Sequence, residues 1–205
     1  GAGDSFAAHM TIALAHGLPL EEAAAIAHAA GRCYVKWPHN RPPYPYEIRK
    51  DIEPGRGKVL AHSDLPMLRK SVPGRLVWTN GVWRLPHAGH AWILRWAREQ
   101  GDVLAVGVNT DESAERIRPS GNFILPLAER IEMLAGMEAV DWIVPFAENN
   151  PCDAIEALQP DVLVSSREYV KAKNILGSDL VKDVRIAPAS PYARHATDIV
   201  KELRR

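Results

Sequence analysis

The segment Leu76–His90, LVWTNGVWRLPHAGH, decides how the rest of the chain is interpreted. Its first four residues form an apolar run that is typical of a buried strand, and the Asn-Gly pair after them is typical of a turn. From Ala91 onward the sequence has the propensity and the spacing of a helix. His87 and His90 therefore lie where a strand connects to the start of a helix. In an α/β sheet this is the usual position of a bound ligand.

The start of such a helix is suited to a phosphate group, because its backbone N–H groups and its dipole both attract negative charge. His87 and His90 are three residues apart in the first turn and can point to one side of the helix. Either imidazole could donate a hydrogen bond to a phosphoryl oxygen and stabilise the charge that develops on it. The alternative is an ordinary helix start that contains two histidines. The strand before them and the helix after them favour the functional interpretation.

On these residues, Leu76–Arg205 resembles the cytidylyltransferase-like nucleotidyltransferases. The closest resemblance is to the adenylyltransferase half of the bifunctional enzymes that make ADP-heptose. That family carries F-T-N-G-C-F-D-x-x-H-x-G-H, and this chain matches it at Thr79-Asn80-Gly81 and at His87-x-Gly89-His90. Val82, Trp83 and Arg84 replace the usual Cys, Phe and Asp.

The rest of this region alternates between apolar runs and helical patterns. This alternation predicts an α/β fold with a Rossmann-like parallel sheet and right-handed crossovers. We expect strands at 76–79, 103–108, 140–146, 160–164 and 184–187, and helices at 91–97, 113–117, 126–137, 152–158 and 195–203. The ligand should lie at the carboxyl ends of the strands.

The resemblance implies further site residues. Asn109 and Asp111 belong to a V-N-x-D-x-S run that the family also carries, although a helix-capping turn is the alternative. Arg130 matches the family's N-P-L-x-x-R helix, whose arginine faces the nucleotide phosphates, with a surface salt bridge as the alternative. The implied catalytic residues are thus His87, His90 and Arg130. The implied nucleotide-binding residues are Thr79, Asn80, Gly81, Gly89, Asn109, Asp111, Arg194 and His195.

The chain departs from the family at three places. Arg84 reverses the charge of the family's aspartate. Ser165 replaces the lysine of K-G-G-D-Y, and Ala193, Arg194 and His195 replace the S-T-T hydroxyls near the C-terminus. Arg194 and His195 could clamp phosphates as cations in place of those hydroxyls. They could equally be solvated surface charges.

Residues 1–36 predict two apolar helices joined at Gly17-Leu18-Pro19, with Asp4 or Ser5 as the first N-cap. The opening G-A-G-D resembles the signature of ribokinase-type (PfkB) sugar kinases. The resemblance implies that Asp4 is the catalytic base and that Gly1 and Gly3 belong to the anion hole. The sheet and the sugar site of such a kinase are not among these residues, so we expect this fragment to have no kinase activity. We also expect the two helices to expose an apolar face.

Residues 37–75 are predicted to be a linker between this helical remnant (1–36) and the nucleotidyltransferase domain (76–205). The segment 37–46 is too rich in proline for a helix or a central strand, and 47–58 is charged. A short capped helix is expected near 63–70.

The overall composition excludes several classes of protein. The chain has 205 residues, with 25 Lys and Arg against 25 Asp and Glu, which gives no reason to expect nucleic acid or a membrane surface as partner. Its two cysteines are far apart, without the spacing of a disulfide framework or a zinc site, which favours a reducing cytoplasm. No apolar run is long enough to span a bilayer. A homodimer is implied by the family resemblance only.

The sequence therefore predicts a nucleotidyltransferase that acts on an NTP and a sugar phosphate and releases pyrophosphate, with Mg²⁺ on the triphosphate. The resemblance implies ATP and heptose 1-phosphate, in the biosynthesis of a nucleotide sugar for lipopolysaccharide. A CTP-dependent polyol-phosphate cytidylyltransferase is one alternative. A catalytically weakened nucleotide-binding or structural domain of the same fold is the other.

Overall fold

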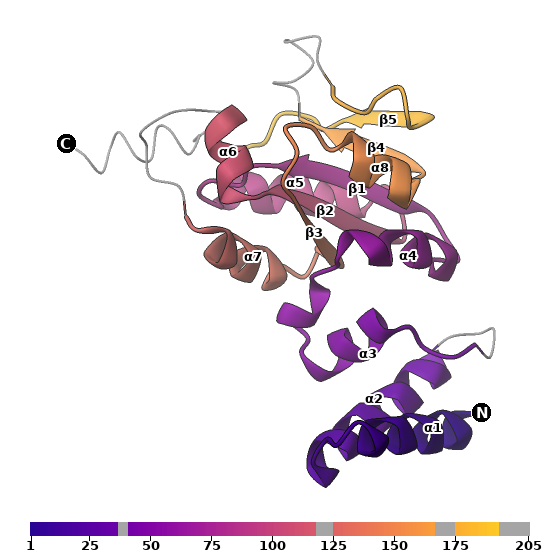
Figure 1. The fold of residues 1–205 in the computed structure, drawn as a ribbon. Coiled ribbons are helices and arrows are strands. Elements are labelled where there is room, and N and C mark those ends of the chain that lie inside the picture. Colours follow the sequence, from indigo (N-terminus) through magenta and orange to yellow (C-terminus); the bar gives the residue numbers. More distant parts are fainter. Residues whose placement is uncertain (37–40, 118–124, 167–174, 193–205) are drawn as a thin grey trace. The chain divides into compact units, whose positions relative to one another are not determined.

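The computed structural model describes residues 1–36, 41–117, 125–166 and 175–192. It divides the chain into two compact units, Gly1–Lys58 and Val59–Arg205. The second unit contains a parallel five-stranded sheet with strand order β3-β2-β1-β4-β5 (Figure 1). Its strands are β1 (Leu76–Gly81), β2 (Val103–Asn109), β3 (Trp142–Phe146), β4 (Val162–Ser165) and β5 (Asp183–Ile186). The predicted α/β fold with a Rossmann-like parallel sheet is confirmed.

The helices of this unit precede β1 or lie between one strand and the next. They are α4 (Leu65–Ser71), α5 (Ala88–Arg98), α6 (Asp111–Ile117), α7 (Leu127–Ala135) and α8 (Cys152–Leu158), after the short 3₁₀ turn η2 (His62–Asp64). Right-handed crossovers place α5 on one face of the sheet and α8, which packs on α4, on the other. The expected closing helix at 195–203 lies outside the described residues. Because the chain leaves β1 toward β2 and later returns to β4 on its other side, β1 and β4 flank the topological switch point.

Strand β1 is longer than the sequence indicated. Asn80 pairs with Gly107 and Gly81 with Val108, so the parallel ladder with β2 continues through the pair that we interpreted as a turn. That prediction was wrong, because the backbone hydrogen bonds of the sheet override the turn propensity of Asn-Gly. The loop to α5 consequently begins at Val82. Helix α6 likewise begins at Asp111, two residues before the expected start.

The first unit opens with the expected helical hairpin, α1 (Ala2–Ala15) and α2 (Leu20–Lys36). The N-cap of α1 is Gly1, so the prediction that Asp4 or Ser5 caps this helix was wrong. Ser5 is instead buried, and its hydroxyl donates a 3.4 Å hydrogen bond to the carbonyl of Ala30 on α2. The small residues at the start of α1 allow the helix to begin three to four residues earlier than a cap at Asp4 or Ser5 would place it.

A third helix, α3 (Pro45–Ile52), occupies part of the segment predicted to be a linker. Pro45 is compatible with the first helical turn, where its missing N–H would have no intrahelical partner anyway. The Glu47 carboxylate accepts the Tyr44 backbone N–H at 2.7 Å, and Tyr46 is fully buried. The Cys33 thiol of α2 donates to the Glu47 carbonyl at 3.4 Å. Helix α3 is therefore a packed part of the first unit, followed by the 3₁₀ turn η1 (Arg56–Lys58).

The remainder of the predicted linker belongs to the second unit. Val59 forms a parallel bridge with Ile143, and the Leu60 N–H donates to the Ile143 carbonyl at 2.8 Å. Leu65 and Leu68 of α4 are buried. The structure thus divides the chain between Lys58 and Val59, where the sequence suggested a linker over residues 37–75. Composition concealed this because prolines and charges outnumber the few side chains that are buried.

Candidate active site

Two imidazoles lie side by side at the start of α5. His87 is the N-cap of this helix and His90 is its third residue, and their ring centroids are 4.0 Å apart. The Gly89 N–H donates to His87 Nδ1 at 3.1 Å, and the His87 N–H donates to His90 Nδ1 at 3.3 Å. Each histidine therefore holds one backbone N–H of the helix start, in the manner of a capping box. The proximity that the spacing predicted is confirmed.

These hydrogen bonds determine which nitrogen carries the proton. A ring nitrogen that accepts a hydrogen bond has no proton of its own, so a neutral imidazole that accepts through Nδ1 is protonated at Nε2. Both His87 and His90 accept through Nδ1. In the neutral form, each is thus the Nε2–H tautomer. The helix start converts two residues of ambiguous tautomer into two hydrogen-bond donors.

Gly89 has no room for a side chain. A Cβ at this position would lie 2.9 Å from His87 Cε1 and 3.1 Å from His87 Nδ1, so any other residue would displace the imidazole. It would also lie 3.7 Å from the carbonyl oxygen of Tyr192. The segment that ends at Tyr192 thus passes beside the histidine helix. Arg194 and His195 are two and three residues after Tyr192, but both lie outside the described residues.

The Thr-Asn-Gly residues lie at the carboxyl end of β1, next to this helix start. The Thr79 hydroxyl is buried and donates to the Val164 carbonyl of β4 at 3.0 Å. The Asn80 side-chain oxygen accepts the Trp78 indole N–H at 3.1 Å. The hydroxyl of Thr79 thus ties β1 to β4 beside the switch point. Nucleotide binding by Thr79, Asn80 and Gly81 stays a prediction.

Arg130 is fully buried on α7, and its guanidinium faces protein atoms. Nη1 donates to the carbonyls of Val82 at 2.6 Å and Asn109 at 2.8 Å, and Nε donates to the Leu125 carbonyl at 2.8 Å. Nη2 pairs with the Asp111 carboxylate at 2.6 Å. Four of its five N–H groups are thereby used to hold three segments together. The sequence motif identified an important arginine but could not show that backbone carbonyls surround it.

Asn109 and Asp111 belong to the same network. The Asn109 side-chain amide donates to the Ser113 hydroxyl at 2.9 Å, and that hydroxyl donates to the Glu148 carbonyl at 2.6 Å. The second Asp111 oxygen accepts the Leu127 N–H at 3.2 Å. The V-N-x-D-x-S run therefore fixes the ends of β2 and β3 and the start of α6. Both residues lie at the carboxyl edge of the sheet, as expected.

The sequence model of the cytidylyltransferase-like family matches residues 78–201, which include this entire site. The chain belongs to the cytidylyltransferase-like family. A second model, that of the pfkB family of carbohydrate kinases, matches residues 1–45. This match ends where α3 begins.

Two curated proteins illustrate the relationship. The bifunctional protein HldE of Nitratiruptor sp. is 36% identical over 91% of this chain and 42% of its own length. The bifunctional protein HldE of Halorhodospira halophila is 34% identical over 100% of this chain and 45% of its own length. The chain therefore spans less than half the length of these relatives. The solved lipopolysaccharide core biosynthesis protein of Thermoplasma volcanium superposes with a TM-score of 0.46 at 18% identity, over 57% of this chain and 98% of that protein.

Two departures from the cytidylyltransferase-like pattern fall among the described residues. Ser165, which replaces the family's lysine, is the last residue of β4, and its carbonyl accepts the Ala187 N–H at 2.9 Å. Arg84 lies in the loop between β1 and α5, and its carbonyl accepts the Leu125 N–H at 3.2 Å. Both occupy the edge of the sheet that carries the histidines. The third departure, at 193–195, lies outside the described residues.

The kinase-like residues have different surroundings. The Asp4 carboxylate is 94% exposed and accepts a hydrogen bond from the Gly1 nitrogen at 2.7 Å. Gly3 is an ordinary helical residue with open space beside it. Neither residue lies in an enclosed anion hole among the described atoms of the first unit.

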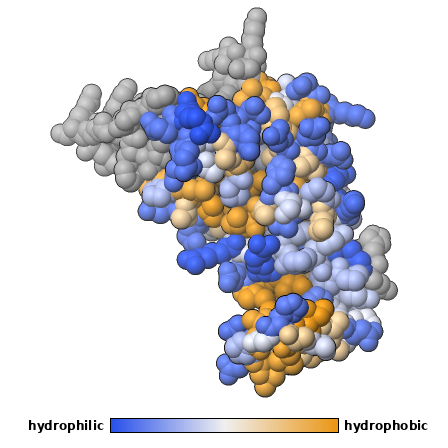
Figure 2. Space-filling view, in the orientation of Figure 1, coloured by the Kyte–Doolittle hydropathy of each residue, from blue (hydrophilic) through white to orange (hydrophobic). Residues whose placement is uncertain are grey.

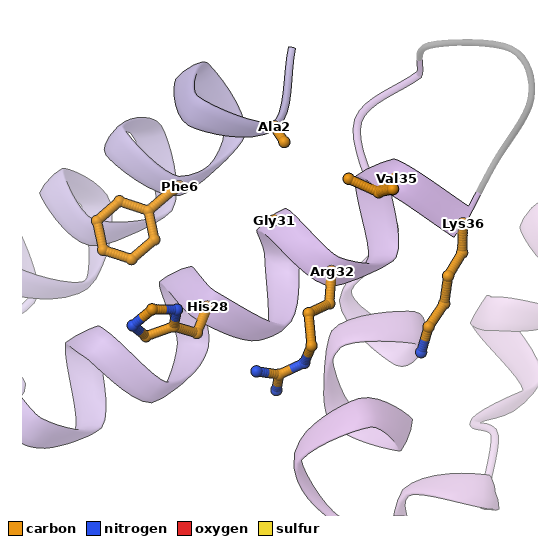
Figure 3. Close-up of a pocket in the computed structure, with 7 residues that line it drawn as sticks. All are labelled: Ala2, Phe6, His28, Gly31, Arg32, Val35 and Lys36. Carbon is orange, nitrogen blue, oxygen red and sulfur yellow. The ribbon is translucent and has the colours of Figure 1, made fainter.

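A pocket of about 520 Å³ lies between α1 and α2 (Figure 3). Phe6 and His28 meet edge-to-face across it, with ring centroids 5.1 Å apart. Its two cationic side chains, Arg32 and Lys36, both pair with Asp51. Because its cationic groups are already paired, this pocket is a weaker candidate site than the histidine pair.

Apolar surface gathers over α1 and α2, as the sequence predicted (Figure 2). The large exposed apolar side chains of this hairpin are Ile12, Leu14, Leu20 and Val35, which are 43% to 72% exposed. Within the described residues, no helix combines the length and the apolar character that crossing a bilayer requires. Cys33 and Cys152 are both free thiols.

Proposed function

We propose that the second unit is a nucleotidyltransferase that moves a nucleotidyl group from an NTP to a sugar phosphate and releases pyrophosphate. The observation that carries this proposal is the pair of His87 and His90 imidazoles, 4.0 Å apart at the N-terminus of α5. They lie at the carboxyl end of β1, beside the switch point of a parallel sheet. Membership of the cytidylyltransferase-like family supports the same reaction class.

In this reaction an oxygen of the acceptor phosphate attacks the α-phosphorus of the NTP in line. The new P–O bond forms as the bond to the bridging oxygen of the β-phosphate breaks, and pyrophosphate leaves with the electron pair. The Nε2–H groups of His87 and His90 donate to the α-phosphate oxygens, where negative charge increases in the transition state. The backbone N–H groups and the dipole of α5 add to this stabilisation. No covalent enzyme intermediate is needed.

Arg130 contributes to this site indirectly. Its guanidinium is buried and holds the carbonyls of Val82, Asn109 and Leu125. It therefore fixes the loop before α5 and the ends of the neighbouring strands, which places the histidines relative to the sheet. We accordingly assign Arg130 as a positioning residue rather than a phosphate ligand.

Mg²⁺ enters with the NTP. Among the described residues, no group of three or more His, Cys, Asp or Glu side chains is arranged to hold a metal ion. Mg²⁺ commonly keeps several waters and binds through substrate phosphates, so this site fits an ion carried by the triphosphate. The ion would supply charge neutralisation on the phosphate oxygens, and the protein would orient the phosphates around it.

ATP and heptose 1-phosphate are the first substrates to test, in the biosynthesis of a nucleotide sugar for lipopolysaccharide. The motif resemblance and the relatives named HldE support this choice. CTP with a polyol phosphate is the second choice. A cytoplasmic location and a homodimer stay predictions.

A catalytically weakened nucleotide-binding domain is the competing function. The observation that favours it is Ser165, which places a short hydroxyl at the carboxyl end of β4 where the family carries a lysine. Each lost electrostatic stabiliser of a phosphoryl-transfer site can reduce the rate about a hundredfold. Such a domain would bind a nucleotide without turning it over.

The deciding experiment measures pyrophosphate release with Mg²⁺, using ATP and CTP in turn with heptose 1-phosphate and with glycerol phosphate. Release that the His90→Ala variant abolishes supports the transferase and identifies its substrates. If no pair gives release and ATP still raises the melting temperature, the chain is a binding domain. If neither ATP nor CTP reacts or raises the melting temperature, both functions are excluded. ADP formation from ATP and a sugar would contradict our expectation that residues 1–36 lack kinase activity.

A further inference from the structure

Trp83 has a backbone conformation that a bulky residue rarely adopts. Its φ is +53°, in the left-handed region, where the clash between Cβ and the backbone costs about 1–2 kcal/mol. Among the described non-glycine residues, only Gln159 shares a positive φ, and Gln159 is the C-cap of α8, where this conformation is ordinary. Trp83 lies in the loop between β1 and α5. The surrounding structure must therefore hold it there, and such strain tends to occur at functional sites.

Contacts on three sides hold Trp83 in place. The Arg130 guanidinium donates to the carbonyl of Val82, which fixes the peptide bond that enters Trp83. The indole N–H donates to the Gly107 carbonyl of β2 at 2.9 Å, and the side chain is 6% exposed. Gly81 provides the necessary room, because a Cβ there would lie 3.3 Å from Trp83 Cε2. The strained residue is thus fastened to both β2 and α7.

The indole of Trp83 packs against one of the two site histidines. Its ring centroid is 5.2 Å from that of His90, and the rings meet edge-to-face at 66°. His87 contacts the same imidazole at 4.0 Å, and the His87 N–H donates to its Nδ1. Rotation of the His90 ring would break this hydrogen bond and the aromatic contact together. An aromatic pair of this kind is worth about 0.5–1.5 kcal/mol.

We propose that Trp83 is a positioning residue that fixes the ring orientation and the Nε2–H tautomer of His90. The family carries phenylalanine at this position, whereas the indole adds an N–H that anchors the ring to β2. The catalytic consequence rests on the proposed transferase function. The effect on His90 does not, because it is a property of the protein without substrate.

The first test is NMR of the full chain labelled with ¹⁵N-histidine, since the two-bond ¹H–¹⁵N couplings report the tautomer of each imidazole. We expect His90 to be the Nε2–H tautomer in the wild type and in Trp83→Phe, and a mixture of both tautomers in Trp83→Leu. Trp142→Phe is the matched control. Trp142 is similarly buried, at 7% exposure, but it is the first residue of β3 and so lies at the amino ends of the strands, away from the carboxyl edge that carries the histidines. It should leave His90 unchanged.

Two results would overturn the proposal. One is a mixture of His90 tautomers in the wild type, a result that can be obtained without any variant. The other is an unchanged His90 spectrum in folded Trp83→Leu, or in Trp83→Met if the leucine variant does not fold. In either case Trp83 is only a core residue.

The second test separates positioning from binding. If the wild type releases pyrophosphate, Trp83→Leu should lower kcat about tenfold and change KM for the NTP less than twofold, and Trp83→Phe should recover most of the loss. Equal losses in Trp83→Leu and Trp142→Phe would contradict positioning. If the wild type releases no pyrophosphate while the tautomer effect is present, the transferase function fails and the positioning role stands.

Discussion

Two helix starts in this chain share one local pattern but differ in their surroundings. Gly1-Ala2-Gly3-Asp4 opens α1, and His87-Ala88-Gly89-His90 opens α5. In both, the N-cap nitrogen donates to the side chain three residues later, over 2.7 Å in the first and 3.3 Å in the second. The polar side chain at the third helical position is therefore held locally in the same way.

The surroundings decide which of the two can be a site. Asp4 is 94% exposed and does not line the pocket between α1 and α2, whose cations already pair with Asp51. His90 lies at the carboxyl edge of a parallel sheet, between the rings of Trp83 and His87. A capping box orients a side chain, but only the edge of the sheet provides the neighbours that a phosphate needs.

The largest effect is expected from Arg130→Met, which disrupts the surroundings of His90. Arg130→Met leaves the carbonyls of Val82, Asn109 and Leu125 without their donor, and buried groups that lose a partner cost about 1–3 kcal/mol each. We expect the free energy of unfolding to fall by about 3–5 kcal/mol. The measurement is urea unfolding followed by tryptophan fluorescence, since most tryptophans lie in the second unit.

Arg116→Met is the matched control for this variant. Arg116 also donates to a backbone carbonyl, that of Ala147, but it is exposed. Its loss should cost less than about 1 kcal/mol, because water replaces the lost bonds. Equal effects of the two variants would show that Arg130 does not organise the edge of the sheet.

The second prediction separates the capping role of His90 from its chemistry. Glutamine is a natural third residue of a capping box, so His90→Gln should keep the hydrogen bond from the His87 N–H. The stability should fall by at most about 1.5 kcal/mol, the value of the lost aromatic contact with Trp83. The variant removes the imidazole donor, and loss of one transition-state donor lowers kcat about a hundredfold or more. Pyrophosphate release and thermal unfolding measure the two effects. A variant with near-normal kcat would mean that His90 is only a cap.

The sequence predicted the strands and helices of the second unit well, because its hydrophobic periodicity agrees with the burial that the sheet imposes. It also predicted that His87 and His90 would meet, since they are three residues apart at a helix start. It did not predict α3, because Tyr46 becomes a core residue only when α2 is present to cover it. The surroundings of Arg130 and the left-handed Trp83 were equally hidden. Both depend on carbonyl groups contributed by segments far away in the chain.

The third prediction compares the two glycines of the shared pattern. A Cβ at Gly89 would lie 2.9 Å from the His87 ring, whereas a Cβ at Gly3 has nothing within 4 Å. Gly89→Ala should therefore displace His87 and lower kcat about tenfold. Gly3→Ala should leave kcat unchanged and stabilise α1 by up to about 1 kcal/mol, because alanine favours the helix. The comparison fails if the two variants have equal effects on pyrophosphate release.

The smallest effect is expected from the ion pairs of Asp51 with Arg32 and Lys36 in the first unit. Burial by itself raises the pKa of Asp51, but the hydrogen bonds and charges of Lys36 and Arg32 outweigh it, so the pKa is lowered overall. A carboxyl whose pKa is lower in the folded state stabilises the fold fully above its unfolded pKa of about 3.9. That stabilisation is lost as the pH falls through the folded pKa. The packing of α3 on α2 should thus weaken below about pH 4.

Hydrogen–deuterium exchange of the α3 peptide, corrected for its intrinsic pH dependence, measures this effect. Relative to Asp51→Asn, the wild type should protect α3 about threefold to fivefold better at pH 5, because the two cations that pair with Asp51 are exposed and their ion pairs are weak. The difference should disappear near pH 2. Glu22→Gln, which removes an exposed carboxylate from α2, should behave like the wild type. If Asp51→Asn also behaves like the wild type at both pH values, the ion pairs of Asp51 do not hold α3 on α2. The burial of Tyr46 and the hydrogen bonds of Glu47 would then account for the packing of α3.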